Sequence, residues 1–177
     1  MVKKIVKFFA YLSFFILAII YFTPKVSLYY LAESKMKHFD VVVTSEVLKD
    51  NGFSLDIKNG TVMVKSIESA KFEDINIKLF GLYNFISVDN IYLSSTAKSF
   101  IPLYIRRINI QYYILNPLNI DMFAIGKFGK AKVVIDLLKR ELRVVLTPSK
   151  LMKTKYRSSL RNLKKSKNGE FTYAKTF

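Results

Sequence analysis

The feature that constrains this chain most is an apolar run close to its N-terminus. Residues 8–22 read FFAYLSFFILAIIYF and contain no charge. With Ile5 and Val6 the run reaches about 18 residues, near the lower limit for crossing a bilayer core, provided that Lys7 extends back to the headgroups. We therefore expect residues 1–23 to form a short cytoplasmic stub and a transmembrane anchor. Its lipid-facing side chains are Phe8, Phe9, Phe14, Phe15, Ile16, Leu17, Ile19 and Ile20.

The flanks of the run indicate how the anchor is used. Three lysines precede it, as in a signal sequence or a signal anchor. The residues that follow, 23–26, read TPKV and offer no pair of small residues for cleavage, so an uncleaved anchor is favoured. The positive-inside rule gives a modest preference for a cytoplasmic N-terminus. The expected location is a single pass through a bacterial inner membrane, with the C-terminal domain in the periplasm.

A short juxtamembrane helix is expected over residues 24–38. Thr23 is a suitable N-cap residue, and Pro24 suits the first helical position. Tyr29 and Tyr30 fit the headgroup region of a membrane, and packing against the domain that follows explains them equally well.

Residues 39–149 carry a different hydrophobic pattern, with a period of two. Apolar and polar residues alternate over 53–58 and over 108–114, and Asn59-Gly60 is a dipeptide typical of tight hairpin turns. About seven such short strands follow one another, which predicts an antiparallel β domain. The apolar face of this sheet has to be covered by curling, by a second layer or by a ligand.

Residues 150–177 are expected to form a basic amphipathic helix and a terminal strand. Residues 150–167 contain no acid, and their apolar residues recur every three or four positions. Such a helix suits anionic lipid or another polyanion, and a solvated helix at one end of the sheet is the alternative. The candidate contacts with a partner or with anionic lipid are Lys150, Lys153, Lys155, Arg157, Arg161, Lys164 and Lys165. The expected fold class is therefore mainly β: an N-terminal transmembrane helix, a curved antiparallel sheet and a C-terminal basic helix.

Net charge and chemistry narrow the choice of function. The chain has 29 Lys and Arg against 13 Asp and Glu, a net charge of +16, which favours anionic neighbours. Codons rich in A and T explain part of the lysine content equally well. There is no cysteine, and His38 is the single histidine, so the sequence offers no zinc site. We expect no catalytic site, no metal and no cofactor, and hence no enzyme.

Three short stretches, 24–31, 59–64 and 160–173, follow one another in an order that resembles the type II secretion protein N family, which is related to AsmA-like envelope proteins. The chain departs from that family in having no tryptophan. The resemblance implies an inner-membrane protein with a periplasmic curved sheet. Its role would be that of an accessory or scaffold component, in contact with protein subunits of a type II secretion, type IV pilus or DNA-uptake machine.

Two alternatives stay open at this point. The first is a lipid-binding or lipid-transport module of AsmA-like type, in which the sheet holds acyl chains. The second is a membrane-anchored protein that contacts nucleic acid, for which Arg106-Arg107 beside Tyr104 and Tyr112 is the best local pattern.

Overall fold

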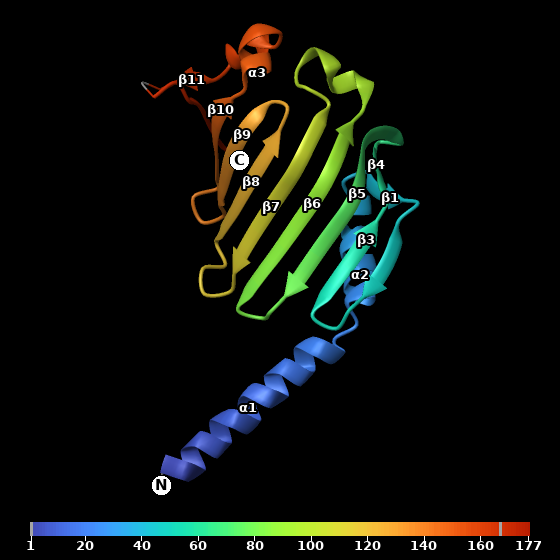
Figure 1. Cartoon of the computed structure of the whole chain (residues 1–177), viewed down its shortest axis with the longest axis vertical. Helices are drawn as coiled ribbons and strands as arrows, with labels where there is room; N and C mark the ends of the chain where they lie inside the picture. The colour runs from blue at the N-terminus through green and yellow to red at the C-terminus, as the bar shows by residue number, and fades with distance from the viewer. Residues whose placement is uncertain (1, 167) are drawn as a thin grey trace.

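The computed structural model describes residues 2–166 and 168–177 (Figure 1). Its architecture is the predicted one, a long apolar helix that leads into an open antiparallel sheet, with short helices near the C-terminus. The helices are α1 (Val2–Phe22), α2 (Lys25–Lys37), the 3-10 helix η1 (Ser95–Ser99), α3 (Lys150–Thr154) and α4 (Arg157–Leu160). The strands are β1 (Val41–Thr44), β2 (Val47–Asp50), β3 (Ser54–Lys58), β4 (Thr61–Val64), β5 (Ile67–Leu79), β6 (Tyr83–Leu93), β7 (Tyr104–Tyr113), β8 (Asn119–Gly126), β9 (Gly129–Asp136), β10 (Glu141–Pro148), β11 (Lys164–Lys165) and β12 (Phe171–Thr176).

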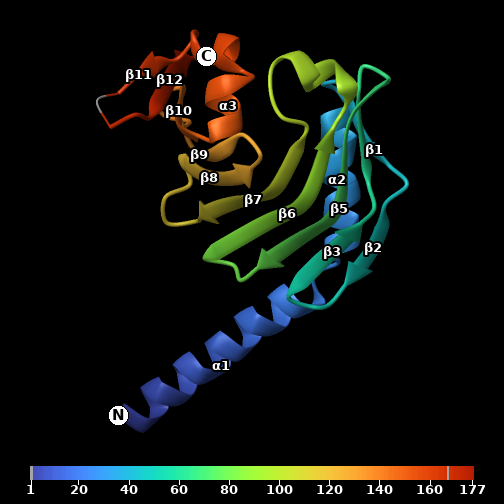
Figure 2. The same ribbon diagram turned by 45° about the horizontal axis from the view of Figure 1, so that its top comes forward.

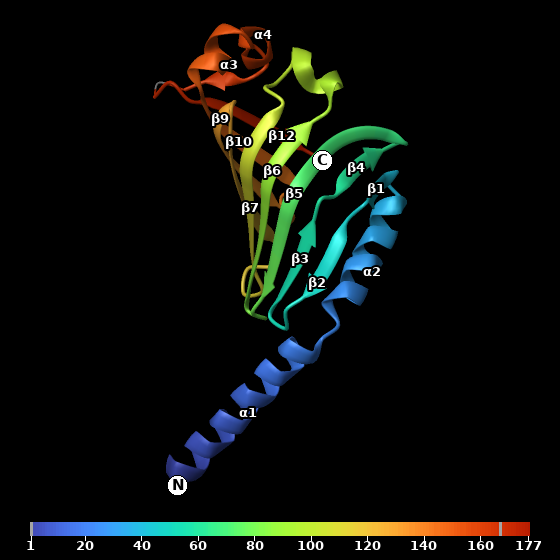
Figure 3. The same ribbon diagram turned by 45° about the vertical axis from the view of Figure 1, so that its right-hand side comes forward.

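Within the described residues the twelve strands form one sheet. From β5 to β10 each strand pairs with the next in the chain, and β12 continues the sheet beside β10. The sheet bends strongly across its width, so that β12 and β10 lie behind β5 and β6 in Figure 3. The terminal strand predicted after the basic segment is confirmed as β12. Strands are more numerous than predicted because residues 41–50 also form two strands, β1 and β2, and Lys164-Lys165 forms β11.

The N-terminal hairpin departs from the prediction in the position of its turn. β3 pairs with β2 and β5, whereas β4 pairs with β1 and β5, so residues 54–64 form one bent strand along β5. The bend lies at Asn59-Gly60, where a Cβ on Gly60 would stand 2.1 Å from Cζ of Phe72. The hairpin turn lies at Asn51-Gly52 instead. The prediction of a turn at Asn59-Gly60 is therefore wrong, because that glycine makes room for an aromatic ring.

α2 begins one residue later than the sequence suggests. Pro24 occupies the cap position, and the hydroxyl of Thr23 donates to the carbonyl of Ile19 at the end of α1 instead of capping α2. The helix packs against β1, β2 and β3, along the edge of the sheet seen in Figure 3. Its Val26 and Tyr29 contact the buried core. The core-packing interpretation of Tyr29 is therefore the one that the structure supports.

The single basic helix predicted over 150–167 is wrong in its length. Two short helices, α3 and α4, are separated at Tyr156, whose backbone leaves the helical region, and Lys164-Lys165 pairs with β12. Met152, Tyr156 and Leu160 recur every four residues and lie in the buried core. The pairing of Lys164-Lys165 with β12 outweighs the helical pattern at the end of the segment.

Candidate membrane and lipid interface

α1 is long and apolar enough to cross a membrane, and it is the one helix with these properties in the described part of the chain. Its apolar window, Lys3–Phe22, buries no residue inside the protein. Seven of the eight side chains predicted to face lipid are exposed, and Ile20 is half-buried. Figure 1 shows the helix leaving the sheet at one end.

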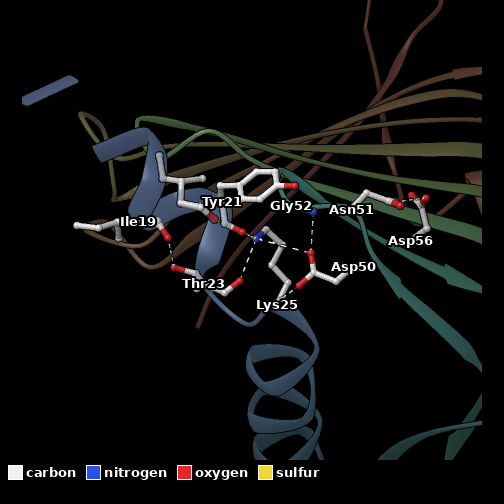
Figure 4. A network of polar contacts seen from close by, with 9 residues as sticks. Ile19, Tyr21, Thr23, Lys25, Asp50, Asn51, Gly52 and Asp56 are labelled. Atoms are coloured by element: carbon white, nitrogen blue, oxygen red, sulfur yellow. Dashed lines mark hydrogen bonds and ion pairs between the residues drawn. The ribbon is translucent and has the colours of Figure 1, made fainter. Parts of the chain in front are cut away.

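A buried lysine joins α1 to the sheet (Figure 4). The side chain of Lys25 is 1% exposed, and its ammonium donates to the carbonyl oxygens of Ile20 at 2.9 Å and Thr23 at 2.9 Å. A cation suits this place because the C-terminus of a helix carries partial negative charge. Lys25 thus closes the end of α1 from within the junction.

Asp50 completes the junction from the sheet. Its carboxylate accepts from the backbone N–H of Lys25 at 3.1 Å and of Gly52 at 2.9 Å, and lies 3.8 Å from the Lys25 ammonium. Burial alone would raise the pKa of Asp50. The two backbone donors and the ammonium outweigh burial and hold that pKa below its ordinary value. One carboxylate therefore caps α2 and fixes the β2–β3 turn.

The end of α1 also contacts the tips of two hairpins. The rings of Tyr21 and Phe53 pack edge to face, with centroids 5.3 Å apart. A Cβ on Gly52 would stand 2.2 Å from the Tyr21 ring, and one on Gly81 would stand 3.1 Å from Ile20. Sequence reasoning missed this junction, because Lys25 and Asp50 are far apart in the chain and neither belongs to a motif.

The sheet presents one apolar face and one polar face. Paired residues of neighbouring strands share a face, so the register shows which side chains form rows. One row crosses β6 to β10 through Ile86, Ile110, Met122, Val133 and Val144, which we call the open apolar row. A parallel row contains Val88, Ile108, Ala124, Ala131 and Leu146, and continues to Phe171 of β12. The alternation read from the sequence thus lines up from strand to strand.

The open apolar row differs from the core of the protein. The five side chains are half-buried, and in the part of the chain that the structure describes they lie outside the buried cluster. That cluster occupies both ends of the same face and also includes the parallel row between Val88 and Phe171. Leu55 and Ile57 lie near α2, and Met152 and Leu160 lie near β10. In Figure 2 the sheet curves around the side on which α3 lies, so this apolar face is the concave one.

The seven predicted basic contacts do not form one surface. Lys153, Arg157, Arg161 and Lys165 line a pocket of about 490 Å³ together with the apolar Leu160, Leu163 and Phe171. Lys164 lines a neighbouring pocket with Arg143 and Tyr173. Lys150 and Lys155 are exposed outside both sets of lining residues. Because Phe171 belongs to both the pocket and the apolar face, the basic pocket opens where that face ends.

The residues that the sequence suggested for contact with nucleic acid, and the single histidine, do not form a binding site among the described residues. Arg107 forms an ion pair with Asp89, and Arg106 is exposed. Tyr104 packs on Tyr92 and donates to Asn90, which uses its hydroxyl within the sheet. Among the described residues no cluster of His, Asp and Glu has the composition of a metal site, and His38 is exposed.

Comparisons with models of known families, with curated proteins and with solved structures gave no match to this chain.

Proposed function

We propose that this protein is a non-enzymatic lipid-binding module, anchored by α1 in a bacterial inner membrane, whose concave apolar face holds the acyl chains of a lipid. The observation that carries the proposal is the open apolar row, a strip of aliphatic side chains across five strands that the chain itself leaves only half-buried. Leaving such a surface to water is unfavourable, by about 25 cal/mol for each Å². A ligand that covers it removes this cost.

The chemistry of the row favours acyl chains over a polypeptide. Its members are Ile, Met and Val, whose side chains cannot satisfy the polar backbone of a protein segment laid across them. Acyl chains have no such groups. One end of the sheet also lies where α1 leaves it, so one end of the face lies beside the source of lipid (Figure 1).

The basic pocket supports an anionic headgroup. Four cationic side chains surround apolar residues that continue the concave face, so an acyl chain on the face and an acidic headgroup in the pocket fit one molecule. Arg157 and Arg161 are the two guanidinium groups, which suit phosphate and carboxylate oxygens.

Adjacent valines of β9 provide a matched test. Val133 pairs with Met122 and Val144 on the apolar face, whereas Val134 pairs with Asp121 and Arg143 on the polar face. The full chain is extracted in mild detergent, and its bound lipid is identified by native mass spectrometry. Val133→Asn should remove most of the bound lipid, and Val134→Asn should leave it unchanged. Equal lipid in all three proteins, or none in the wild type, would contradict the proposal.

A second candidate is the accessory role in an envelope assembly, with protein subunits as partners. The resemblance in the order of elements supports it, as do Lys150 and Lys155, which are exposed apart from the pocket. Reversing these two lysines to Glu should abolish co-purification with a partner and spare bound lipid. Reversing Arg157 and Arg161 should change the lipid instead. If neither pair alters co-purification, the basic segment is not the partner surface.

A further inference from the structure

The hairpin tips at the α1 end of the sheet share an unusual composition. Residues 80–82 read FGL, residues 114–118 read ILNPL and residues 137–140 read LLKR. We call these three turns the rim. Leu115 is 85% exposed and Leu138 is 74% exposed, which is extreme for large aliphatic side chains. The other exposed apolar members of the rim are Phe80, Leu82, Ile114, Leu118 and Leu137.

Hydrogen bonds join the three turns into one continuous edge. The backbone N–H of Ile114 donates to the carbonyl of Leu82 at 3.0 Å, and that of Leu137 donates to Leu118 at 2.7 Å. The rim adjoins the end of α1, because Gly81 lies against Ile20. Figures 1 and 3 show the turns at the end of the sheet from which α1 departs.

The turns at the opposite end have a different character. β4 and β5 are joined by Lys65-Ser66, and the segment 94–103 between β6 and β7 reads SSTAKSFIPL, in which Phe100 is exposed. Exposed apolar residues occur singly in these turns, whereas each turn of the rim carries at least two. The charged residues within the rim are Lys139 and Arg140, and Lys139 forms an ion pair of 3.5 Å with Asp136 at the base of its turn. Apolar tips next to cationic side chains match the interface of a membrane with anionic headgroups.

We propose that the rim inserts into the headgroup and outer acyl region of the same bilayer that α1 crosses. The apolar tips then leave water, and Lys139 and Arg140 reach the headgroups. The inference rests on the proposal that α1 spans a membrane, and goes beyond it, because a helix and a freely exposed sheet would need no apolar rim. The occupant is lipid because the edge continues from an apolar helix and exposes mainly aliphatic side chains.

The absence of cysteine allows the depth of single positions to be measured. Leu115→Cys and Leu138→Cys are labelled with an environment-sensitive NBD fluorophore in the full chain, reconstituted in liposomes with anionic lipid. Phe100→Cys, 67% exposed in the segment between β6 and β7, is the matched control. Nitroxide-labelled lipid should quench both rim labels several-fold more than the control. A water-soluble quencher should show the reverse order, and emission from the rim labels should be blue-shifted.

Two outcomes overturn the proposal. If the rim labels are quenched from water as efficiently as the Phe100→Cys label, the rim is free in solution. If they are protected from both quenchers, a second protein copy covers the rim instead of lipid. Flotation of the same liposomes reports on α1 separately, because protein that does not float has lost its anchor. Failure of the anchor and failure of the rim are thereby told apart.

Discussion

The two halves of the concave face carry the same alternation of apolar and polar residues and end in different states. On the N-terminal half, Leu55 and Ile57 are almost completely buried, with Val26 and Tyr29 of α2 packed into the same core. On the central and C-terminal half, Ile105 and Leu146 are buried as well, but Ile110 and Val133 of the open apolar row are only half-buried. A strand pattern therefore shows which side chains share a face, and the elements packed on that face decide which of them become core.

The sharpest test of this comparison exchanges one isoleucine in each half. Ile57→Ala removes a side chain that is 1% exposed and should lower the free energy of unfolding by about 2–5 kcal/mol. Ile110→Ala removes a half-exposed one and should lower it by about 1 kcal/mol. Denaturant titration of both variants in nanodiscs, followed by circular dichroism, measures the difference. Equal losses would show that the open row is covered in the isolated chain.

Breaking the junction tests whether the covered half depends on α1 and α2 being held in place. Lys25→Met removes the buried ammonium and leaves the carbonyls of Ile20 and Thr23 without their donor. The free energy of unfolding should fall by about 1–3 kcal/mol. Hydrogen exchange of α2 should accelerate in the same variant, while exchange of β8 and β9 stays as in the wild type. Uniform acceleration over the sheet would mean that the two halves are one cooperative unit.

The bend in the N-terminal hairpin offers a steric test. Gly60→Ala places a Cβ against the Phe72 ring, so the ring has to move within a packed core. A loss of about 1–3 kcal/mol in the free energy of unfolding is expected. The control is the same change in a Phe72→Ala background, where the ring that the added Cβ would meet is absent. Full stability of Gly60→Ala would show that the bend tolerates a side chain.

The smallest expected effect concerns acid stability. Because the pKa of Asp50 is lower in the folded protein, its contribution to folding is complete above the ordinary value of 3.8 and is lost as the pH falls through the folded value. Asp50→Asn should therefore be less stable than the wild type at neutral pH, and this difference should shrink below pH 3.8. Unfolding curves at the two pH values measure it. A constant difference would remove Asp50 from the acid response.

The sequence was informative wherever one local pattern decides the outcome. The apolar run at 8–22 predicted α1, and strict alternation predicted strands such as β7. Prediction failed where distant residues decide. The Asn59-Gly60 pair packs against the Phe72 ring and forms a bend, and pairing of Lys164-Lys165 with β12 ends the basic helical segment early. The sequence predicted which basic residues are candidates for contact. It could not predict which of them line a pocket and which are exposed elsewhere, because the pocket forms only when β12 pairs with β10.

The junction at Lys25 has a mechanical consequence. Twenty helical residues at 1.5 Å each give about 30 Å, close to the thickness of a hydrocarbon core. In a thinner bilayer such a helix responds by tilting. Lys25 and Asp50 connect the end of α1 to the β2–β3 turn by hydrogen bonds, so the helix and the sheet are not joined by a flexible linker that could absorb this tilt. On the proposal that α1 spans a membrane, a tilt of α1 would therefore change the orientation of the sheet relative to the membrane surface.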